Sequence, residues 1–417
     1  MEWLAEYEQI RDQYHAIGVR HRAALAERWA QRQFPHDLWC DVADAGLFRA
    51  ALGGQMKRQV LTYAAATHGL TSGSCHLGFN ISTGVQAILT IPILDQYASQ
   101  EVREAYLAPA VSGKIILAFA TTEPHGGSDA FHPETRLRRG PGGLYLDGAK
   151  WHITNAPIAD VFLVWCADEA TGGMSAVLVE SSWPGVNCSP PLAPAGMRTS
   201  PVGSIRFDSV AIPKTHVLGA GRGNEILHGV IGPERLLSGF GTIGILDQVL
   251  DQMLAFSINR QVRGKPIAPH QHIQRRISDV AVSRQMTIAL AHSTLDRYLR
   301  DESIDLESAA LKLYGMQAGL DGCIDAMKLC GSYGLQEEAR LYQCALDFLC
   351  GSVAGGTEEA MRLVIARELA KSHHERSSKL LQESRADEGS SNVASLRQWE
   401  RVRGVGAWRQ IHEREWR

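Results

Sequence analysis

Apolar residues recur at intervals of three and four over most of the first 118 residues, which is the spacing of helices that bury one face. The clearest segments are 2–32 and 35–51. The same periodicity returns after residue 223 in the segments 226–260, 272–301, 308–328, 336–349 and 357–375. Long helices joined by short connections predict a bundle in this second region.

Between residues 119 and 222 the pattern changes to short apolar runs separated by turn residues. The runs 161–166, 175–179 and 204–212 predict strands. The run 144–146 leads into Asp147-Gly148, a pair typical of a tight turn. This part of the chain is therefore predicted to be a β domain, a small barrel or sandwich.

The predicted fold class is α+β, with two helical regions around one β region. The expected boundaries are an N-terminal helical domain at 1–118, a central β domain at 119–222 and a C-terminal helical bundle at 223–380. Residues 381–417 are rich in Glu, Ser and Arg and are expected to form a charged extension.

Composition narrows the class of protein. The chain has 417 residues, of which 45% are hydrophobic, so it can bury a large core. Its formal net charge of -3 gives no basic surface for nucleic acid. No apolar run approaches the roughly 20 residues that a membrane helix needs, and the acidic N-terminus is unlike a signal peptide. We therefore expect neither a nucleic-acid nor a membrane partner.

Cysteine and histidine usage gives two further expectations. The eight cysteines are scattered without a Cys-X-X-Cys pair, so we expect reduced thiols and a cytoplasmic protein. The sixteen histidines show no metal-binding spacing, so we expect no metal.

Small residues fill the segment 68–88, which contains Gly69, Gly73 and Gly78. Such residues favour close helix packing, which is the interpretation that we prefer. The alternative is that they form the wall of a narrow acyl pocket.

The segment 119–129 carries the most distinctive chemistry. It places two threonines, Thr121 and Thr122, before Pro124 and Gly126-Gly127, and Ser128 follows. Hydroxyls beside exposed backbone N–H groups can cradle an anion such as a pyrophosphate. An ordinary Pro-Gly-Gly loop is the alternative.

The order Thr-Glu-Pro-X-X-Gly-Ser-Asp in this loop closely resembles the signature of the acyl-CoA dehydrogenase family of flavoproteins. The sequence of helical, β and helical regions is that family's layout, so the resemblance covers about residues 1–380. It implies an acyl-CoA dehydrogenase fold and bound FAD.

A second block, 147–156, resembles the family's Gly-X-Lys-X-Trp-Ile-Thr-Asn. The resemblance implies that Thr154 faces the flavin N5 and that Ser128 binds the pyrophosphate. His152 stands where the family has Trp. The other FAD contacts that it implies are Phe119, Thr121, Thr122, Gly127, Arg260, Gln271, Gly331, Thr357 and Glu359.

Other family positions are altered. Arg260 and Gln271 match residues that bind FAD across a subunit interface in family members, but Arg263 stands where Phe is usual. Ser332 replaces a Gly, and the usual Arg-Asp pair is Leu346-Asp347, so that the aspartate loses its charged partner. These differences indicate a divergent branch.

The catalytic base is also displaced. Many family members have Tyr-Glu-Gly-Thr where this chain has Ala354-Gly355-Gly356-Thr357. The isovaleryl and long-chain branches place the base at a Glu-Arg on a facing helix, and Glu234-Arg235 matches that position. Glu234 is therefore the predicted base. Its alternative role is to stabilise a helix that opens at Pro233, through the helix dipole. Glu358 or Glu359 could supply the base after a local shift.

The resemblance implies an FAD-dependent dehydrogenase that oxidises an acyl thioester by α-proton abstraction and β-hydride transfer to flavin N5. The expected substrate contacts are Ser128, Arg235, Gly355 and Gly356. The thioester could be carried by CoA or by an acyl or peptidyl carrier protein, as in secondary metabolite biosynthesis. The electron acceptor would be an electron-transfer flavoprotein or oxygen, and the protein a homodimer or homotetramer.

Two other functions remain open from the sequence. A flavin-dependent monooxygenase on the same fold would need no α-proton base. A flavin-free relative acting in complex assembly is the non-catalytic alternative.

Overall fold

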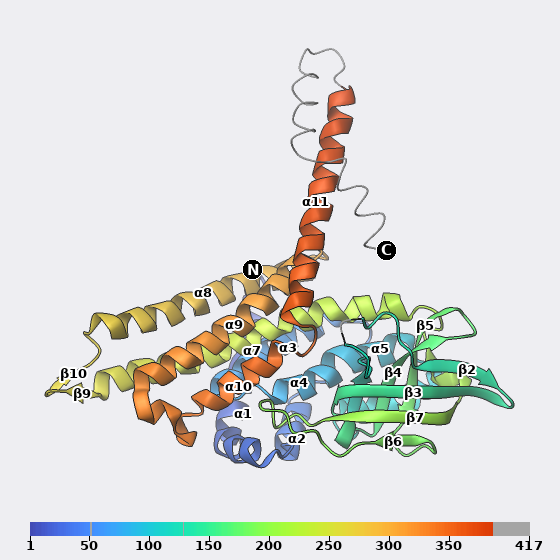
Figure 1. Cartoon of the computed structure of the whole chain (residues 1–417), viewed down its shortest axis with the longest axis horizontal. Coiled ribbons are helices and arrows are strands. Elements are labelled where there is room, and N and C mark those ends of the chain that lie inside the picture. Colours follow the sequence, from blue (N-terminus) through green and yellow to red (C-terminus); the bar gives the residue numbers. More distant parts are fainter. Residues whose placement is uncertain (51, 128, 387–417) are drawn as a thin grey trace. The chain divides into compact units, whose positions relative to one another are not determined.

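The computed structural model confirms the α+β class (Figure 1). The structure describes residues 1–50, 52–127 and 129–386. Its N-terminal helices are α1 (Leu4–Gln31), α2 (His36–Asp44), α3 (Met56–Ser74), α4 (Phe79–Gly84), α5 (Ile91–Tyr97) and α6 (Gln100–Val111), with a π-helical segment, η1 (Val85–Thr90), between α4 and α5.

Glycines allow α1 and α3 to pack with their backbones in contact. A Cβ on Gly18 would lie 2.6 Å from the carbonyl oxygen of Leu70, and a Cβ on Gly69 would overlap the carbonyl oxygen of Arg11. A Cβ on Gly73 would meet the backbone of α1 in the same way. Close helix packing therefore accounts for these small residues, and the alternative of an acyl-pocket wall is not needed for them.

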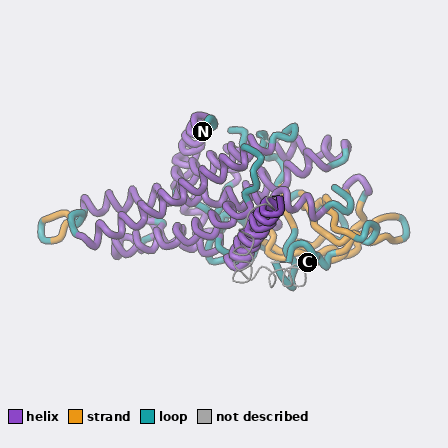
Figure 2. The backbone as a smooth tube through the Cα atoms, turned by 90° about the horizontal axis from the view of Figure 1, so that it is seen from above, coloured by secondary structure: helices purple, strands orange, loops and turns teal. Residues whose placement is uncertain are grey.

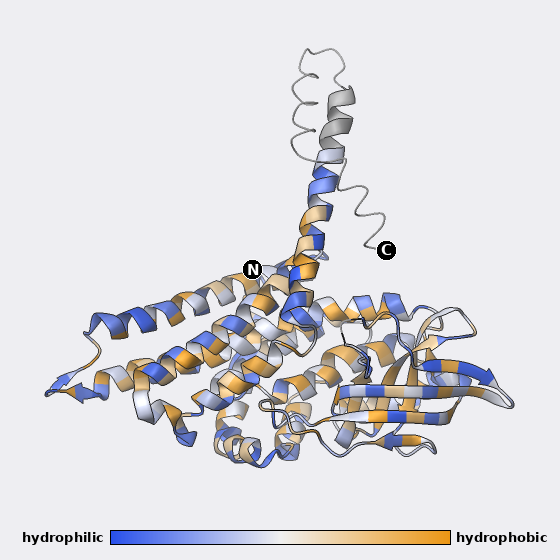
Figure 3. Ribbon diagram, viewed as in Figure 1, coloured by the Kyte–Doolittle hydropathy of each residue, from blue (hydrophilic) through white to orange (hydrophobic). Residues whose placement is uncertain are grey.

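The central region is one mixed sheet of eight strands (Figure 2). The strands are β1 (Leu117–Ala120), β2 (Arg136–Gly140), β3 (Gly143–Thr154), β4 (Val161–Asp168), β5 (Gly173–Glu180), β6 (Val186–Cys188), β7 (Val202–Ile212) and β8 (Val217–Leu218). Their order is β6-β7-β3-β2-β4-β5-β8, and β1 pairs in parallel with β4. Strand β2 is strongly hydrophilic (Figure 3).

The predicted tight turn at Asp147-Gly148 is wrong. Strand β3 continues through both residues, and the chain instead turns between Gly140 and Gly143. The pairing of β3 with β7 shifts register between Leu146 and Gly148, and the extra residue lies on β7, where Ser209 has a φ of +50°. On β3, Gly148 has a φ of +144°. Thr135 fills the space that a side chain would need there.

Helix α7 (Gly223–Asn259) is the spine of the second helical region. It is followed by the strands β9 (Gln261–Val262) and β10 (Lys265–Pro266) and by the helices α8 (Gln271–Leu299), α9 (Asp305–Cys330), α10 (Leu341–Gly351) and α11 (Glu358–Ala386). The short 3₁₀ segments are η2 (Ala156–Ile158), η3 (Lys214–His216), η4 (Gly331–Leu335) and η5 (Glu337–Ala339).

The expectation that a helix opens at Pro233 is wrong, because Pro233 lies inside α7. Proline has no N–H, so it cannot donate the helical hydrogen bond to the carbonyl oxygen of Gly229. Apolar residues on both sides of Pro233 are buried, and this burial keeps α7 continuous. Glu234 is therefore in the middle of a helix, where the dipole of a helix N-terminus does not act on it.

Helix α7 joins two apolar cores. Its first half, including Leu236 and Phe240, packs with the N-terminal helices and with residues of β4 and β5. Its second half, including Val249 and Met253, packs with α8, α9 and α10. A third core lies within the sheet.

Asp347 on α10 connects segments that are far apart in the sequence. Its Oδ1 accepts hydrogen bonds from the Trp29 indole at 2.9 Å and from the Met197 N–H at 2.5 Å. Its Oδ2 accepts one from the Gly78 N–H at 3.1 Å. Burial raises the pKa of this carboxyl to about 6. Three N–H donors thus surround the aspartate whose arginine partner is missing from the sequence.

Contacts divide the chain into Met1–Ile365 and Ala366–Arg417. Within the second unit, residues 366–386 are described as the continuation of α11. The expected extension at 381–417 falls largely outside the described residues. Of the helices in the described ranges, none has an apolar stretch long enough to cross a lipid bilayer.

We predict that Asp347→Leu lowers the free energy of unfolding by about 3 kcal/mol, because it leaves buried N–H donors without an acceptor. Urea unfolding followed by circular dichroism measures the loss. The control is Asp321→Leu at an exposed position of α9, which should change stability by about 0.5 kcal/mol or less. Equal losses in the two variants would contradict the role given to Asp347.

Candidate active site

A buried ion pair joins the two motif segments. The ammonium of Lys150 on β3 lies 2.7 Å from Oε1 of Glu123, and both side chains are almost completely buried. Lys150 also donates to the carbonyl oxygen of Thr121 at 3.0 Å. Lys150, in the segment 147–156, thereby holds Thr121 of the segment 119–129 in place.

Glu123 also fixes the far side of its loop. Its carboxylate accepts the N–H groups of Glu134 at 2.7 Å and of Thr135 at 2.9 Å. Although burial opposes ionisation, these bonds and the Lys150 ammonium lower the pKa of Glu123. The loop between residues 123 and 135 is therefore closed at its base by one charged side chain.

The edge of this site is a bulge in β3. The pairing with β7 shifts between Lys150 and Ile153, and His152 has a φ of +54°. The Trp151 N–H donates to the carbonyl oxygen of Thr122 at 2.9 Å. The bulge leaves the rings of Trp151 and His152 exposed beside the loop, and Thr154, two residues further on, is half-buried.

Asn155 anchors the end of β3. Its side-chain amide donates to the carbonyl oxygens of Leu117 at 3.0 Å and of Ser82 at 3.2 Å, and its N–H donates to that of Pro201 at 2.8 Å. Phe119 on the neighbouring strand β1 packs edge-on against Trp165, with ring centroids 5.5 Å apart. Asn155 thus has a structural role beside Thr154.

A ring contact brings the loop that follows the first motif to α7. Phe131 stacks on His228, with ring centroids 4.4 Å apart and an interplanar angle of 22°. Glu234 lies six positions after His228, which is about 9 Å along a helix. The first motif and the predicted base are therefore connected through α7.

Glu234 and Gly355 are in direct contact. A Cβ on Gly355 would lie 3.1 Å from both Cδ and Oε2 of Glu234, and closer still to Oε1. Gly355 has a φ of +63°, which side chains rarely allow. The absence of a side chain at position 355 is therefore what lets the glutamate occupy this place.

Burial raises the pKa of the Glu234 carboxyl, while the positive charges of Lys312 and Arg235 oppose the rise. The residue as a whole keeps part of its surface accessible. A carboxylate in such surroundings can accept a proton near neutral pH.

The alternative bases are less suitable. Glu358 pairs with Arg362 at 3.2 Å, one turn along α11. Glu359 is exposed, and its own N–H and the Thr357 hydroxyl lower its pKa. The Thr357 hydroxyl also accepts the Ala360 N–H at 3.3 Å and so caps α11. A lowered pKa makes a carboxylate a weaker base.

The remaining predicted contacts lie elsewhere. Arg260 and Gln271 flank the hairpin β9–β10, at the opposite end of the first unit from the sheet (Figure 1). Arg260 lies over the ring of Tyr333, 5.6 Å from its centroid, and Gly331 is two residues before this tyrosine. Arg260, Gln271 and Gly331 are all exposed. Within a single chain, these three residues do not lie near Glu234.

The residues present fit a planar cofactor beside β3. Trp151 is 40% exposed and meets the ring of His152 in an edge-on contact, with ring centroids 6.0 Å apart, so part of its aromatic surface stays open beside β3. The Trp151 N–H bonds to the carbonyl oxygen of Thr122, and the hydroxyl-bearing residues Thr121, Thr122 and Thr154 are half-buried. The loop at Gly126 is open, since a Cβ there would meet no atom within 4 Å. Ser128 lies outside the described residues.

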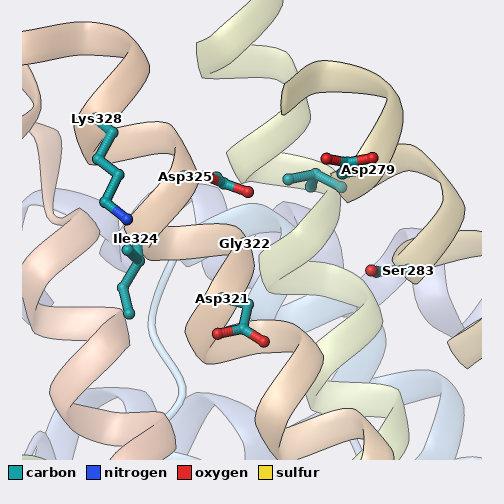
Figure 4. A pocket seen from close by; sticks show the side chains of 8 residues that line it. Asp279, Ser283, Asp321, Gly322, Ile324, Asp325 and Lys328 are labelled. Carbon is teal, nitrogen blue, oxygen red and sulfur yellow. The ribbon is translucent and has the colours of Figure 1, made fainter. Parts of the chain in front are cut away.

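Two other polar clusters do not belong to this site. A groove of about 370 Å³ between α8 and α9 gathers three carboxylates and an ammonium (Figure 4); it is lined by Asp279, Ser283, Asp321, Gly322, Asp325 and Lys328, among others. Glu123, His125 and Glu134 place possible metal ligands within 4.8 Å of one another, a grouping that sequence spacing did not predict. Glu123 is already bonded to two N–H groups and to Lys150.

Sequence reasoning missed several residues of this site. Lys150 was part of a recognised motif, but nothing in the motif indicated its bond to Glu123. Lys312 occupies an apolar position in the periodic pattern of α9, and that signal could have identified it as a buried charge.

The three family models for acyl-CoA dehydrogenases match the chain in order. The N-terminal domain model matches residues 5–114, the middle domain model matches 118–210 and the C-terminal domain model matches 221–370. Together they cover both motif segments, Glu234 and Gly355.

Individual relatives are similar over most of the chain. An L-prolyl-[peptidyl-carrier protein] dehydrogenase from Serratia sp. (strain ATCC 39006) is 28% identical over 354 residues, which cover 82% of this chain and 90% of that protein. A mitochondrial isovaleryl-CoA dehydrogenase from Oryza sativa subsp. japonica is 27% identical over 378 residues, covering 87% and 91%. A solved FAD complex of PigA superposes with a TM-score of 0.82 at 25% identity, covering 88% and 97%.

We predict that Lys150→Met weakens FAD binding at least about tenfold. Without the ammonium, the buried carboxylate of Glu123 has no compensating charge, and Thr121 loses the hydrogen bond to its carbonyl oxygen. Titration of the flavin-free protein with FAD, followed by flavin fluorescence, measures the affinity. The exposed Lys114→Met is the control and should bind FAD as the wild type does. Unchanged affinity in Lys150→Met would show that the ion pair does not shape the cofactor site.

Proposed function

Because the chain belongs to the acyl-CoA dehydrogenase family, we propose that Glu234 is the base that takes the α-proton of its acyl-thioester substrate. The protein is an oxidoreductase that dehydrogenates acyl thioesters at a CH–CH bond, and its cofactor is FAD. The dehydrogenases among its relatives give no support to a monooxygenase. The observation that carries the proposal is the contact between the Glu234 carboxyl and Gly355.

The residues of this chain divide the work of the reaction. Glu234 removes the proton from Cα, and FAD, when bound, accepts the hydride from Cβ. The loop at Gly355 and Gly356 offers backbone N–H groups to the thioester carbonyl, which favours the negative charge that develops there. Thr121, Thr122, His152 and Thr154 line the cofactor side, with Phe119 behind them.

The burial of Glu234 suits this role. A carboxyl whose pKa is raised holds a proton more firmly once it has taken it. The positive charges of Lys312 and Arg235 oppose this rise and so favour the ionised form of the base. Glu358 and Glu359 lack this balance of burial and charge.

The proposal also covers the carrier of the acyl group, the electron acceptor and the oligomeric state. The acyl group is carried by CoA or by the phosphopantetheine arm of a carrier protein, and the similarity to a prolyl-carrier-protein dehydrogenase supports a small acyl unit of biosynthetic origin. An electron-transfer flavoprotein or oxygen reoxidises the enzyme. Arg260, Gln271 and Gly331 contact FAD of a second subunit, because in one chain they lie far from β3, and this makes the protein a homodimer or homotetramer.

The direct test is an anaerobic absorbance titration with a panel of acyl-CoA and acyl-carrier-protein thioesters. Loss of the flavin absorbance band with one class of thioester supports the proposal and identifies the carrier. A flavin that no thioester reduces would refute it.

We predict that Glu234→Gln retains FAD but slows thioester-dependent flavin reduction by about 10²–10⁴-fold. In the wild type the base acts only when ionised, so the rate should rise with pH through a pKa above the ordinary value of 4.5. This rise should disappear in the variant. Stopped-flow absorbance measures both effects, and Glu225→Gln, an exposed change on the same helix, is the control.

We predict that Gly355→Ala destabilises the wild type more than it destabilises a Glu234→Ala variant. In both backgrounds the left-handed backbone costs about 1–2 kcal/mol, but only the wild type also has the clash with the carboxyl. A double-mutant cycle by urea unfolding should give a coupling energy of at least about 1 kcal/mol. Additive effects would mean that the two residues are not in contact.

A further inference from the structure

A lysine is buried next to the proposed base. Lys312 lies in the second turn of α9, on its buried face, and is 3% exposed. Burying an ammonium group is costly unless polar partners replace its water. The hollow beside it, lined in part by Met316, Gly356 and Met361, is too small to hold a water molecule. The protein itself must therefore supply the partners of this charge.

Those partners are backbone carbonyl groups of the loop that faces Glu234. The Lys312 ammonium donates to the carbonyl oxygen of Ala354 and, at 2.9 Å, to that of Gly356. In a trans peptide, the C=O of one residue and the N–H of the next point in opposite directions. Holding these two carbonyls therefore directs the N–H groups of Gly355 and Thr357 away from Lys312.

We propose that Lys312 is a positioning residue for the dehydrogenation proposed above, on which this inference rests. Its ammonium fixes the peptide planes at 354–355 and 356–357, so that their N–H groups face the substrate side of the loop. The same charge acts on Glu234 from the adjoining helix. One side chain thus sets both the orientation of the loop and the ionisation of the base.

The charges around Glu234 support this assignment. Lys312 reaches it from α9 and Arg235 from its own helix α7, while the buried Tyr63 of α3 feels its charge. The loop 354–356 brings no ionisable side chain. Burial lowers the pKa of Lys312 to about 8, and the Glu234 carboxylate opposes that change. Near pH 7 the lysine is mostly charged, so it favours the ionised form of the base.

Three substitutions separate the two roles of Lys312. Lys312→Met removes both the charge and the hydrogen bonds, and Lys312→Gln keeps a donor without the charge. Lys312→Arg keeps the charge on a larger, planar group that cannot replace a compact ammonium in a closed space. Lys328→Met, an exposed change on the same helix, is the matched control.

The first readout does not depend on activity. Hydrogen–deuterium exchange of peptides covering residues 351–361 should be at least tenfold faster in Lys312→Met and close to the wild type in Lys312→Gln. An infrared titration of the Glu234 carboxyl, identified by its loss in Glu234→Gln, should show its pKa raised by about one unit in both variants.

The second readout is the pH profile of flavin reduction by a thioester. Its midpoint should move upward by about one pH unit in Lys312→Met and Lys312→Gln. In Lys312→Arg the midpoint should equal that of the wild type, while residues 351–361 should still exchange faster than in the wild type. If Lys312→Met does not fold, Lys312→Gln decides the charge effect, and Lys312→Arg decides the loop effect.

Unchanged exchange together with an unchanged carboxyl titration in Lys312→Met would overturn the inference and leave Lys312 a packing residue. The proposed function fails separately, if no thioester reduces the wild-type flavin or if Glu234→Gln is reduced as fast. In that case the exchange and infrared measurements still decide whether Lys312 positions the loop.

Discussion

The site depends on the close approach of a helix side chain to a backbone without a side chain. Glu234 can point toward the loop before α11 only because Gly355 offers no Cβ and adopts a positive φ. Once the carboxylate is there, its burial must be balanced by positive charge, and Lys312 and Arg235 provide it. Lys312 in turn is tolerated because the same loop gives it carbonyl oxygens. Helix, loop and lysine therefore stabilise one another.

The cofactor side is built on the same physical basis. There the buried charge is Glu123, and its partners are Lys150 and two backbone N–H groups. In both halves of the site, a loop is held by one buried charged side chain that bonds to backbone groups. This arrangement fixes main-chain geometry while leaving the loop surface available for a ligand.

Periodicity was sufficient to predict the long elements. The segment 226–260 forms α7 almost residue for residue, and 161–166 and 204–212 lie in β4 and β7. Two local signals gave wrong predictions, because Asp147-Gly148 and Pro233 are residues that by propensity interrupt strands and helices. Gly148 lies within β3, where Thr135 takes the space of a side chain, and Pro233 is kept in a helix by the burial around it. Tertiary packing decided both cases.

The partners of charged residues were not predictable. Asp347 bonds to donors at positions 29, 78 and 197, and no local pattern records contacts over such distances in the sequence. The pairing of Glu234 with Gly355 was suggested only because family members exchange the base between two positions. The physical contact explains that exchange, since the two side chains would compete for one space.

The glycine contact between α1 and α3 has a consequence for how this protein can change. Position 18 of α1 and positions 69 and 73 of α3 admit no side chain, because even a methyl group would overlap a backbone atom of the opposite helix. Substitutions at these positions cannot be absorbed by a rotamer change, as they can at most core positions. These three positions are thus among the least mutable in the molecule, although neither helix carries one of the motifs. Differences among relatives at these positions should therefore reflect a change in the distance between the backbones of α1 and α3, and not a change in chemistry.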